Sequence, residues 1–355
     1  MRLARLVRQL GREGKLPYFI SSLPNIDYLT GFKGSYAYLV VDRKRSYFIS
    51  DSRYEEYATS ILPAGVEFCL QKNDFAGSIK AVLDRAGVKR LYLEEHALPL
   101  STYHMLREGL GRIKLERGGD AVNTLRVVKD DEEIAILKEA AAITDRCMER
   151  LTEFIRPGLT EWDVANEIEN FYRTNGCRKT SFTSIVASGA GASMPHYVTS
   201  LEKTIESGDA VLVDMGCHYR GYNSDLTRTV FVGSVDDRMR EIYGIVREAQ
   251  ERAVAAVRPG ITAGKLDSVA RDIIRKRGYG DFFGHSLGHG VGLDVHELPA
   301  IRPKGTFRLK KNSVITVEPG IYLPGKGGVR IEDMVLVTAS GNEVLSKFTK
   351  DIVVI

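Results

Sequence analysis

Short apolar runs alternate with longer amphipathic stretches along the first third of the chain. The runs are rich in aromatic and β-branched residues, which is typical of strands, and the stretches between them carry helix or turn signals. The expected strands cover residues 18–22, 36–41, 46–50, 66–70 and 90–94. The polar residues 42–45 (DRKR) between the second and third runs favour a hairpin turn. This part of the chain is therefore predicted to form a small α/β domain.

A long amphipathic helix is predicted next, and it opens a second domain. Asp130 and Glu133 have the spacing of a capping box, and Pro157 with Gly158 ends the helical pattern. Between them, core-type residues recur at helical spacing: Ile134, Leu137, Ala141, Thr144, Met148, Leu151 and Ile155. We therefore expect one domain over residues 1–124 and a second over residues 125–355.

The second domain contains an internal repeat. RPGLT at 156–160 returns as RPGIT at 258–262, and an amphipathic stretch follows each copy. Further on, SGDAVLVDMG is echoed by KNSVITVEPG, which places Asp214 opposite Glu318. Two copies are too few for a solenoid, which needs about three stacked units. We expect two α/β halves related by a pseudo-two-fold axis, with Asp214 and Glu318 facing one central site.

Each half of the repeat carries a pair of acidic residues. Asp214 is followed by Asp225 in the first half, and Glu318 is followed by Glu332 in the second. Any one of these acids alone would be explained by a surface salt bridge or a turn. Burying a carboxylate beside an apolar strand is costly unless a partner or a metal compensates its charge. Four acids arranged by the repeat therefore favour a shared site.

Histidines lie between the two acidic pairs. His285, His289 and His296 occur in FFGHSLGHGVGLDVHELP, where the glycines favour an irregular or strand-like segment that lines a cleft. His196 follows a proline in ASMPHY, which is predicted to be a loop. The remaining histidines of the first domain, His96 and His104, have unrelated surroundings and are interpreted as structural.

Four carboxylates and at least one imidazole match the needs of two divalent metal ions. Such pairs of ions lie about 3.5–4 Å apart, activate a shared water and stabilise a tetrahedral oxyanion, which is hydrolase chemistry. An oxygen-rich donor set without thiolates favours Mn²⁺ first, with Co²⁺, Zn²⁺ or Fe²⁺ as alternatives. A single carboxylate pair, as in glycosidases, would explain two of the acids and leave the other two unexplained.

Composition narrows the class of protein without identifying it. With 50 Lys and Arg against 46 Asp and Glu, the formal net charge is +4, and 43% of residues are hydrophobic, which excludes a disordered or fibrous chain. The basic patches are short, so we expect no nucleic-acid partner, and no apolar run is long enough to span a membrane. Four scattered cysteines without a CxxC pair indicate reduced thiols and a cytoplasmic protein.

The order of the acids and histidines resembles a known pattern. Asp214 in VDMG, Asp225 in SDLTRT, His289 in GHGVGLDVHE, Glu318 in TVEPGIY and Glu332 in VRIEDMVLV occur in the order of the five metal ligands of the metallopeptidases with the pita-bread fold. That family includes methionine aminopeptidase, aminopeptidase P and prolidase. The resemblance covers nearly the whole chain and implies a pita-bread catalytic domain.

The resemblance also implies roles for the metal ligands. Asp225 and Glu332 would bridge the two metals, Asp214 would complete one metal site, and His289 with Glu318 would complete the other. Glu318 would in addition be a candidate acceptor for a proton from the attacking water, since a carboxylate close to the water can serve as a general base.

Further residues match the surroundings of the metals in this family. His196 and His296 match histidines that position the scissile carbonyl and assist the departing amine. His285 matches a histidine of the proline-specific branch. Arg330 and Tyr322 match residues that support the ligands from behind, where an arginine would orient an aspartate ligand.

The first domain resembles the creatinase-like α/β domain of the proline-specific branch, with SSLPNIDYLTGF at 21–32 as its opening. The implied activity is cleavage of the Xaa-Pro bond, in dipeptides or at the N-terminus of longer peptides, and the implied assembly is a homodimer. Two alternatives stay open. One is a creatinase-like amidinohydrolase, which uses no metal, and the other is a non-catalytic binding module. Both predict missing ligand positions.

Overall fold

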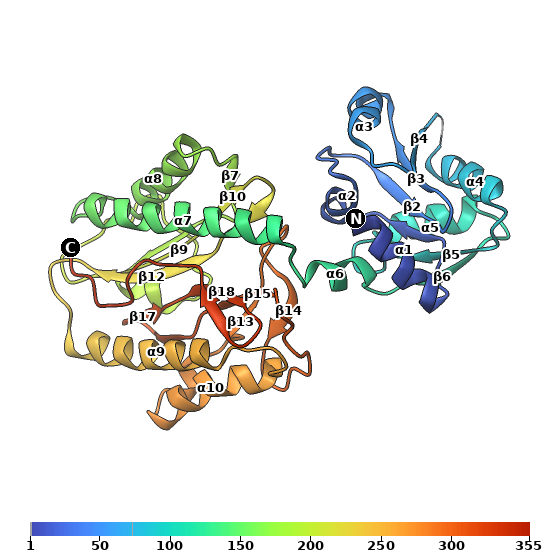
Figure 1. Ribbon diagram of the computed structural model, residues 1–355. Helices are drawn as coiled ribbons and strands as arrows, with labels where there is room; N and C mark the ends of the chain where they lie inside the picture. Colours follow the sequence, from blue (N-terminus) through green and yellow to red (C-terminus); the bar gives the residue numbers. More distant parts are fainter. Residues whose placement is uncertain (1, 73) are drawn as a thin grey trace. The chain divides into compact units, whose positions relative to one another are not determined.

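The computed structural model describes residues 2–72 and 74–355, and the chain divides into two compact units, Met1–Arg126 and Val127–Ile355 (Figure 1). The sequence predicted a boundary after residue 124, close to this division. Each unit has its own hydrophobic core, so each is described by itself.

The first unit is a mixed α/β domain with a six-stranded sheet in the order β4-β3-β2-β1-β5-β6. Its strands are β1 Tyr18–Ile20, β2 Tyr38–Val41, β3 Ser46–Ser50, β4 Val66–Leu70, β5 Arg90–Leu93 and β6 Lys114–Arg117. Its helices are α1 Arg2–Glu13, α2 Leu23–Thr30, α3 Glu55–Ile61, α4 Phe75–Ala86, α5 Leu100–Gly109 and α6 Ala121–Arg126, with the 3-10 turn η1 Ser52–Tyr54.

The five strands expected from the apolar runs are all present in this sheet. β2 and β3 pair antiparallel, which confirms the hairpin predicted around residues 42–45. Their inward side chains, Val40 and Ile49, join Phe19 and Leu91 in a buried cluster beneath α4 and α5. β6 was not predicted, because its sequence KLER contains one apolar residue and gives no alternation signal.

The second unit is a larger α/β domain. Its helices are α7 Asp131–Phe154, α8 Glu161–Thr174, α9 Asp237–Ala256 and α10 Ala263–Lys276, with the 3-10 turns η2 Gly189–Ser193 and η3 Gly280–Phe282. Its strands are β7 Lys179–Thr180, β8 Ile185–Ser188, β9 Ala210–Met215, β10 Cys217–Tyr219, β11 Tyr222–Asn223, β12 Leu226–Phe231, β13 Gly288–Gly290, β14 Glu297–Ile301, β15 Val314–Val317, β16 Gly320–Leu323, β17 Gly327–Arg330, β18 Asp333–Val337 and β19 Asn342–Val344.

The order of elements in the second unit follows the sequence repeat. In the first half, β8, β9 and β12 form a sheet with β9 in the middle, and in the second half β13, β15 and β18 are hydrogen-bonded in the same order. Each half contains two helices separated by the RPGLT or RPGIT motif. The halves meet where the backbone N–H of Glu332 donates to the carbonyl of Thr227, 3.1 Å away. Matching strands therefore bring both halves to one place.

The long helix that opens the second unit begins as predicted. The Asp130 side chain accepts a hydrogen bond from the backbone of Glu133, and the Glu133 side chain accepts one from Asp130, which is a complete capping box. The helix ends at Phe154, before Pro157. It packs against α8 through a fully buried cluster that includes Met148, Leu151 and Ile168.

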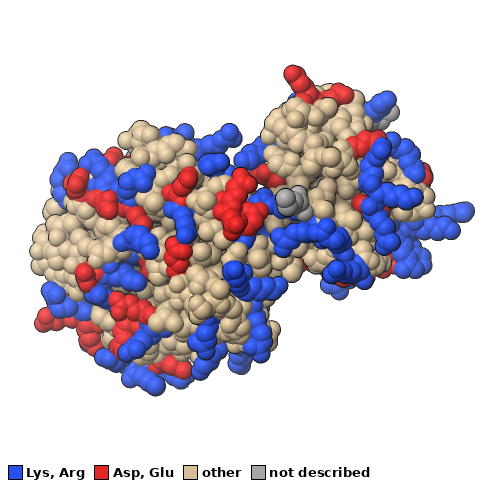
Figure 2. Space-filling model, in the orientation of Figure 1, with Lys and Arg blue, Asp and Glu red and all other residues tan. Residues whose placement is uncertain are grey.

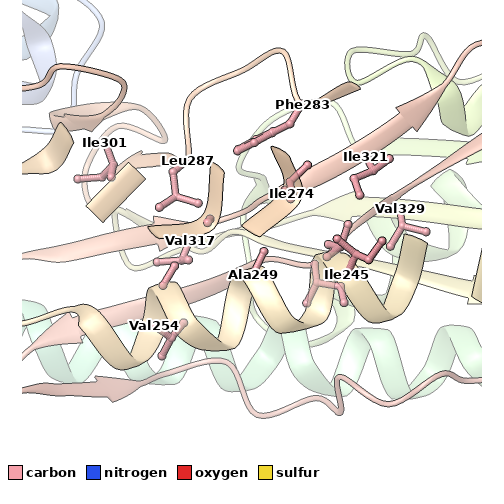
Figure 3. Packing of buried hydrophobic residues seen from close by; sticks show 14 of the residues in the cluster. Ile245, Ala249, Val254, Ile274, Phe283, Leu287, Ile301, Val317, Ile321 and Val329 are labelled. Carbon is pink, nitrogen blue, oxygen red and sulfur yellow. The ribbon is translucent and has the colours of Figure 1, made fainter. Parts of the chain in front are cut away.

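A second core lies between helices α9 and α10 and the sheet of the second half. Figure 3 shows Ala249 and Val254 of α9 in one cluster with Val317, Leu287 and Ile274 of α10. These side chains are almost completely buried, and each contributes about 25 cal/mol for every Å² of apolar surface removed from water. This packing fixes the segment on which the predicted histidines lie.

Surface charge, hydropathy and the cysteines characterise the chain further. Acidic and basic side chains are mixed over the second unit on the face drawn in Figure 2. In the part of the chain that the structure describes, no helix has both the length and the apolar character needed to cross a membrane. The four cysteines are free thiols, and Cys147, Cys177 and Cys217 are buried packing residues as expected.

Candidate metal centre

The five predicted ligands come from five different places in the two halves. Asp214 lies near the end of β9, and Asp225 lies just before β12. His289 is the central residue of the short strand β13. Glu318 directly follows β15, and Glu332 lies between β17 and β18. The strand-like character expected around His289 is confirmed, and the ends of paired strands bring the acids to one region.

Three of the five form a group that could hold a metal ion. One ligand atom each of Asp225, His289 and Glu332 lies within 4.8 Å of the others. The Nε2 atom of His289 lies 3.6 Å from Asp225 Oδ2 and 3.3 Å from Glu318 Oε1, so Glu318 adjoins the same group. Asp214 belongs to the same electrostatic environment: burial raises its pKa, and the charge of Glu318 adds to this increase.

Hydrogen bonds behind the ligands fix their orientation. His289 Nδ1 lies 3.1 Å from the carbonyl of Gly290, and donation there leaves Nε2 free to face the carboxylates. The hydroxyl of Thr316 donates to Glu318 Oε1 over 3.1 Å. The hydroxyl of Thr227 donates to Glu332 Oε2 over 2.6 Å. These contacts hold the donor atoms in place before any ion binds.

The electrostatics of the site call for positive charge. Burial, together with the charges of neighbouring acids, raises the pKa of Asp225 and of Glu332 well above the ordinary carboxyl values. Burial alone would lower the pKa of His289, but its hydrogen bond to Glu318 and the surrounding negative charge raise it to about 9. The acidic site thus stabilises the protonated form of His289.

This donor set fits divalent metal ions. Ligand atoms of Asp225, His289 and Glu332 converge, with Glu318 beside them. Burial, followed by repulsion from neighbouring acids, raises the pKa of Asp225 and of Glu332, and a cation would offset both effects. Oxygen and imidazole donors without a thiolate suit hard or borderline metals. The residues present therefore match what a metallopeptidase centre requires.

Arg330 and Tyr322 link the site to one of the predicted histidines. Arg330 Nη2 donates to Asp214 Oδ2 over 2.6 Å, and Arg330 Nη1 donates to the Tyr322 hydroxyl over 2.9 Å. That hydroxyl lies 2.8 Å from His285 Nε2. Burial raises the pKa of Tyr322 to about 12, so the phenol stays protonated at neutral pH. An uninterrupted chain of polar contacts thus runs from Asp214 to His285.

His296 and His196 lie at the edge of this group. The His296 ring centroid is 4.2 Å from that of His289. His196 is on the loop after η2, as predicted, and its charge contributes to lowering the pKa of His285 and His296, in each case after the larger effect of burial. Short distances and hydrogen bonds therefore join nine of the ten residues selected from the sequence, and the tenth, His196, acts on two of them through its charge.

Two threonines at the site were not selected from the sequence. Thr227 lies two residues after Asp225, and Thr316 lies two residues before Glu318. Side chains two apart on a strand point to the same face, so strand periodicity around each acid could have identified them.

Family comparisons agree with this geometry. The model for metallopeptidase family M24 matches residues 135–339, and the model for the creatinase/prolidase N-terminal domain matches residues 2–128. A Xaa-Pro dipeptidase of Pyrococcus furiosus is 40% identical over 354 residues, which is 99% of this chain and 99% of the relative.

Solved structures give the same result. The structure described as a Xaa-Pro dipeptidase from Bacillus anthracis superposes with a TM-score of 0.96 at 40% identity, covering 100% of this chain and 99% of that one. The X-Pro aminopeptidase from Thermotoga maritima superposes with a TM-score of 0.89 at 37% identity and covers 100% of both chains. The fold expected from the sequence, a creatinase-like domain followed by a pita-bread catalytic domain, is confirmed. The chain belongs to metallopeptidase family M24 and is a peptidase.

Proposed function

We propose that this protein hydrolyses the bond between an N-terminal residue and proline, in Xaa-Pro dipeptides and in peptides with proline at the second position. The observation that carries the proposal is the convergence of ligand atoms from Asp225, His289 and Glu332 within 4.8 Å, with Glu318 beside them. The names of the relatives support the proline specificity. An Xaa-Pro bond is a tertiary amide without an N–H, which favours a dedicated site.

The proposed ligands are the five residues of the sequence pattern. Asp225 and Glu332 would bridge two ions, Asp214 would complete one site, and His289 with Glu318 would complete the other. When bound, two divalent ions supply Lewis acidity that activates a water and polarises the scissile carbonyl. Glu318 is proposed as the acceptor of the proton from the attacking water, because a carboxylate among the ligands would lie within reach of that water.

The substrate is proposed to lie against the histidines. His196 and His296 would donate hydrogen bonds to the scissile carbonyl and supply a proton to the departing proline nitrogen. His285 and Tyr322 share a hydrogen bond of 2.8 Å, so the two would act as one unit that orients the bound peptide. Arg330 would keep Asp214 in its ligating orientation, supported by their 2.6 Å contact.

Mn²⁺ is the proposed native metal, two ions per chain. The donor set consists of carboxylates and one imidazole, and such oxygen-rich sets favour Mn²⁺ over softer metals, while Co²⁺, Zn²⁺ and Fe²⁺ remain compatible. Metal analysis of the protein purified without added metals tests the identity of the ion.

The experiment that tests the proposed function measures cleavage of the bond before proline. The protein is incubated with Mn²⁺ and with either Ala-Pro, Ala-Pro-Ala or Ala-Ala, and liberated amine is measured over time. Cleavage of one or both proline peptides and none of Ala-Ala is expected. The ratio of Ala-Pro to Ala-Pro-Ala turnover decides whether the enzyme is mainly a dipeptidase or an aminopeptidase. Creatine serves as the control for an amidinohydrolase, and turnover of creatine without proline-peptide cleavage would contradict the proposal.

A cytoplasmic location and a homodimeric state are further parts of the proposal. Both are carried over from the sequence: the location from the scattered cysteines, and the dimer from the resemblance to the proline-specific branch. Cell fractionation tests the first. Light scattering coupled to size-exclusion chromatography tests the second, and a mass equal to one chain would contradict the dimer.

A further inference from the structure

Two of the buried carboxylates outside the proposed ligand set lie near the start of helices α8 and α10, one in each half of the second unit. Glu161 is the first residue of α8 and is 0% exposed, and Asp267 lies in the second turn of α10 and is 1% exposed. The two helices follow the RPGLT and RPGIT copies of the repeat. A buried carboxylate needs compensating hydrogen bonds, so its partners indicate what it holds.

Glu161 holds the two ends of the segment 188–200. Its Oε1 atom accepts hydrogen bonds from the backbone N–H and the hydroxyl of Ser188, each over 2.7 Å. Its Oε2 atom accepts a hydrogen bond from the backbone N–H of Ser200 over 3.0 Å. The ammonium of Lys203 lies 3.3 Å from Oε1 and offsets the buried charge. One carboxylate thereby closes a loop of the backbone.

This closed loop carries His196 and is fixed at its centre as well. Arg330 Nη1 donates to the carbonyl of Pro195 over 3.4 Å, so the guanidinium that binds Asp214 also contacts the residue before His196. A Cβ atom at Gly328 would lie 2.2 Å from the carbonyl of Ala192, so the loop packs directly on the backbone of β17. The position of His196 depends on these three attachments.

Asp267 makes similar contacts in the second half, although it lies about one turn further along its helix than Glu161 does. Its Oδ1 atom accepts a hydrogen bond from the backbone N–H of Leu287 over 3.2 Å, and it pairs with Arg271 over 2.8 Å. Arg271 in turn donates to the carbonyls of Phe283 and His285, over 2.9 Å and 2.8 Å. The segment that carries His285 is therefore tied to α10 through this carboxylate.

Helix formation does not require these carboxylates. α8 and α10 are each capped by a threonine, Thr160 and Thr262, whose side chain accepts a backbone N–H of the first turn. The repeat places Ala263 at the position of Glu161, and α10 starts there all the same. The Glu161 carboxylate therefore serves the loop and not the helix.

We propose that Glu161 and Asp267 are positioning residues, which hold His196 and His285 at the distance and angle that substrate binding and proton transfer require. The inference rests on the proposed function, because it assigns the two histidines to the substrate side of the site. Misplacing a catalytic group by about 1 Å costs about 100-fold in rate, so release of either loop is expected to lower turnover strongly.

A double-mutant cycle tests whether each carboxylate acts through its histidine. Glu161→Gln is expected to lower kcat roughly 10- to 100-fold on Ala-Pro, and Glu161→Ala by more, because the glutamine carbonyl can still accept from Ser188. In a His196→Ala background, Glu161→Gln is expected to cost less than about 2-fold more. In a His285→Ala background, Glu161→Gln is expected to lower kcat by the same factor as it does in the unmodified protein. For Asp267→Asn, the loss in kcat is expected to disappear in the His285→Ala background and to remain in the His196→Ala background.

Backbone hydrogen exchange gives a readout that does not depend on turnover. Glu161→Gln is expected to accelerate amide exchange in residues 188–200 and leave residues 283–287 unchanged, and Asp267→Asn is expected to do the reverse. Glu202→Gln, at an exposed glutamate two residues beyond this segment, is the matched control and should change neither exchange nor kcat. Metal content and melting temperature are measured for every variant, and unchanged metal content is expected.

The results separate this inference from the proposed function. Equal losses from Glu161→Gln with and without His196, or unchanged exchange at 188–200, would overturn the positioning role even if proline peptides are cleaved. If the unmodified protein cleaves no proline peptide, the proposed function fails, and the exchange experiment still decides whether the carboxylates hold the two loops.

Discussion

Glu332 and Asp333 are adjacent acids with different roles, because neighbouring side chains along a strand point to opposite faces. Thr227 donates to the Glu332 carboxylate, while the next residue of β12, Arg228, binds Asp333 over 2.7 Å on the opposite face. Burial and neighbouring acids raise the pKa of Glu332. Burial also acts on Asp333, but Arg228 and Lys350 outweigh it and lower its pKa. Among the residues that the structure describes, Glu332 has no cationic partner of this kind and is a proposed metal ligand, whereas Asp333 is neutralised within the scaffold.

Removing Arg228 is expected to destabilise the protein strongly. Arg228 and Asp333 are each 1% exposed, and Arg228→Ala would leave a buried carboxylate with part of its compensation lost. Breaking a buried pair in this way costs about 3–5 kcal/mol. Urea denaturation measures the change in the free energy of unfolding. Arg247→Ala, which breaks an exposed pair with Glu251, is the control and is expected to cost less than about 1 kcal/mol. Equal effects of the two substitutions would contradict this account.

At the scale of elements, helix α9 depends on its first turn. The Asp236 side chain accepts hydrogen bonds from the backbone N–H groups of Arg238 and Met239, which have no partner within the helix. Asp236→Ala is expected to lower the free energy of unfolding by about 1 kcal/mol. Glu241→Ala, at an exposed position of the same helix, should change it by less than about 0.5 kcal/mol. Thermal or urea unfolding measures both changes. A larger decrease in the free energy of unfolding for Glu241→Ala than for Asp236→Ala would contradict the capping role of Asp236.

Most elements with a strong local signal could be predicted from the sequence. The capping box and the period of apolar residues located α7, and the branched and aromatic runs located β1 to β5. β6 gave no such signal, because its stability comes from pairing with β5 and not from its own pattern. Short strands such as β13 are also set by their neighbours, since a glycine-rich stretch has no strand preference of its own.

At the scale of the whole molecule, the duplication is what made the site predictable. The repeat places Asp214 opposite Glu318. The resemblance to the family adds His289 as a ligand and His196, His285 and His296 as its neighbours. The contacts of Glu161 and Asp267 could not be predicted, because each depends on which loop lies next to a helix of the same half. A sequence repeat identifies equivalent positions, but it does not show which backbone N–H groups need a hydrogen-bond acceptor from a side chain.

Metal binding is expected to stabilise the second unit. Burial and then repulsion from neighbouring acids raise the pKa of Asp225 and of Glu332, so the ionised acids are unfavourable without a cation. Ions that bind only the folded state add about 2.7 kcal/mol each at 100 times their Kd. The melting temperature should therefore rise when Mn²⁺ is added to chelator-treated protein. Glu332→Ala should remove most of that rise. An equal rise in this variant would place the stabilising ions elsewhere.

The measurement that tests the central claim most directly is a metal titration of activity. Protein stripped with a chelator is titrated with Mn²⁺, and release of proline from Ala-Pro is followed at each step, alongside Asp225→Ala under the same conditions. We expect no activity without metal, activity that saturates at two ions per chain, and at least a roughly 100-fold lower rate for Asp225→Ala. Full activity in the stripped protein, or no proline release at any concentration of Mn²⁺, Co²⁺ or Zn²⁺, would contradict the account.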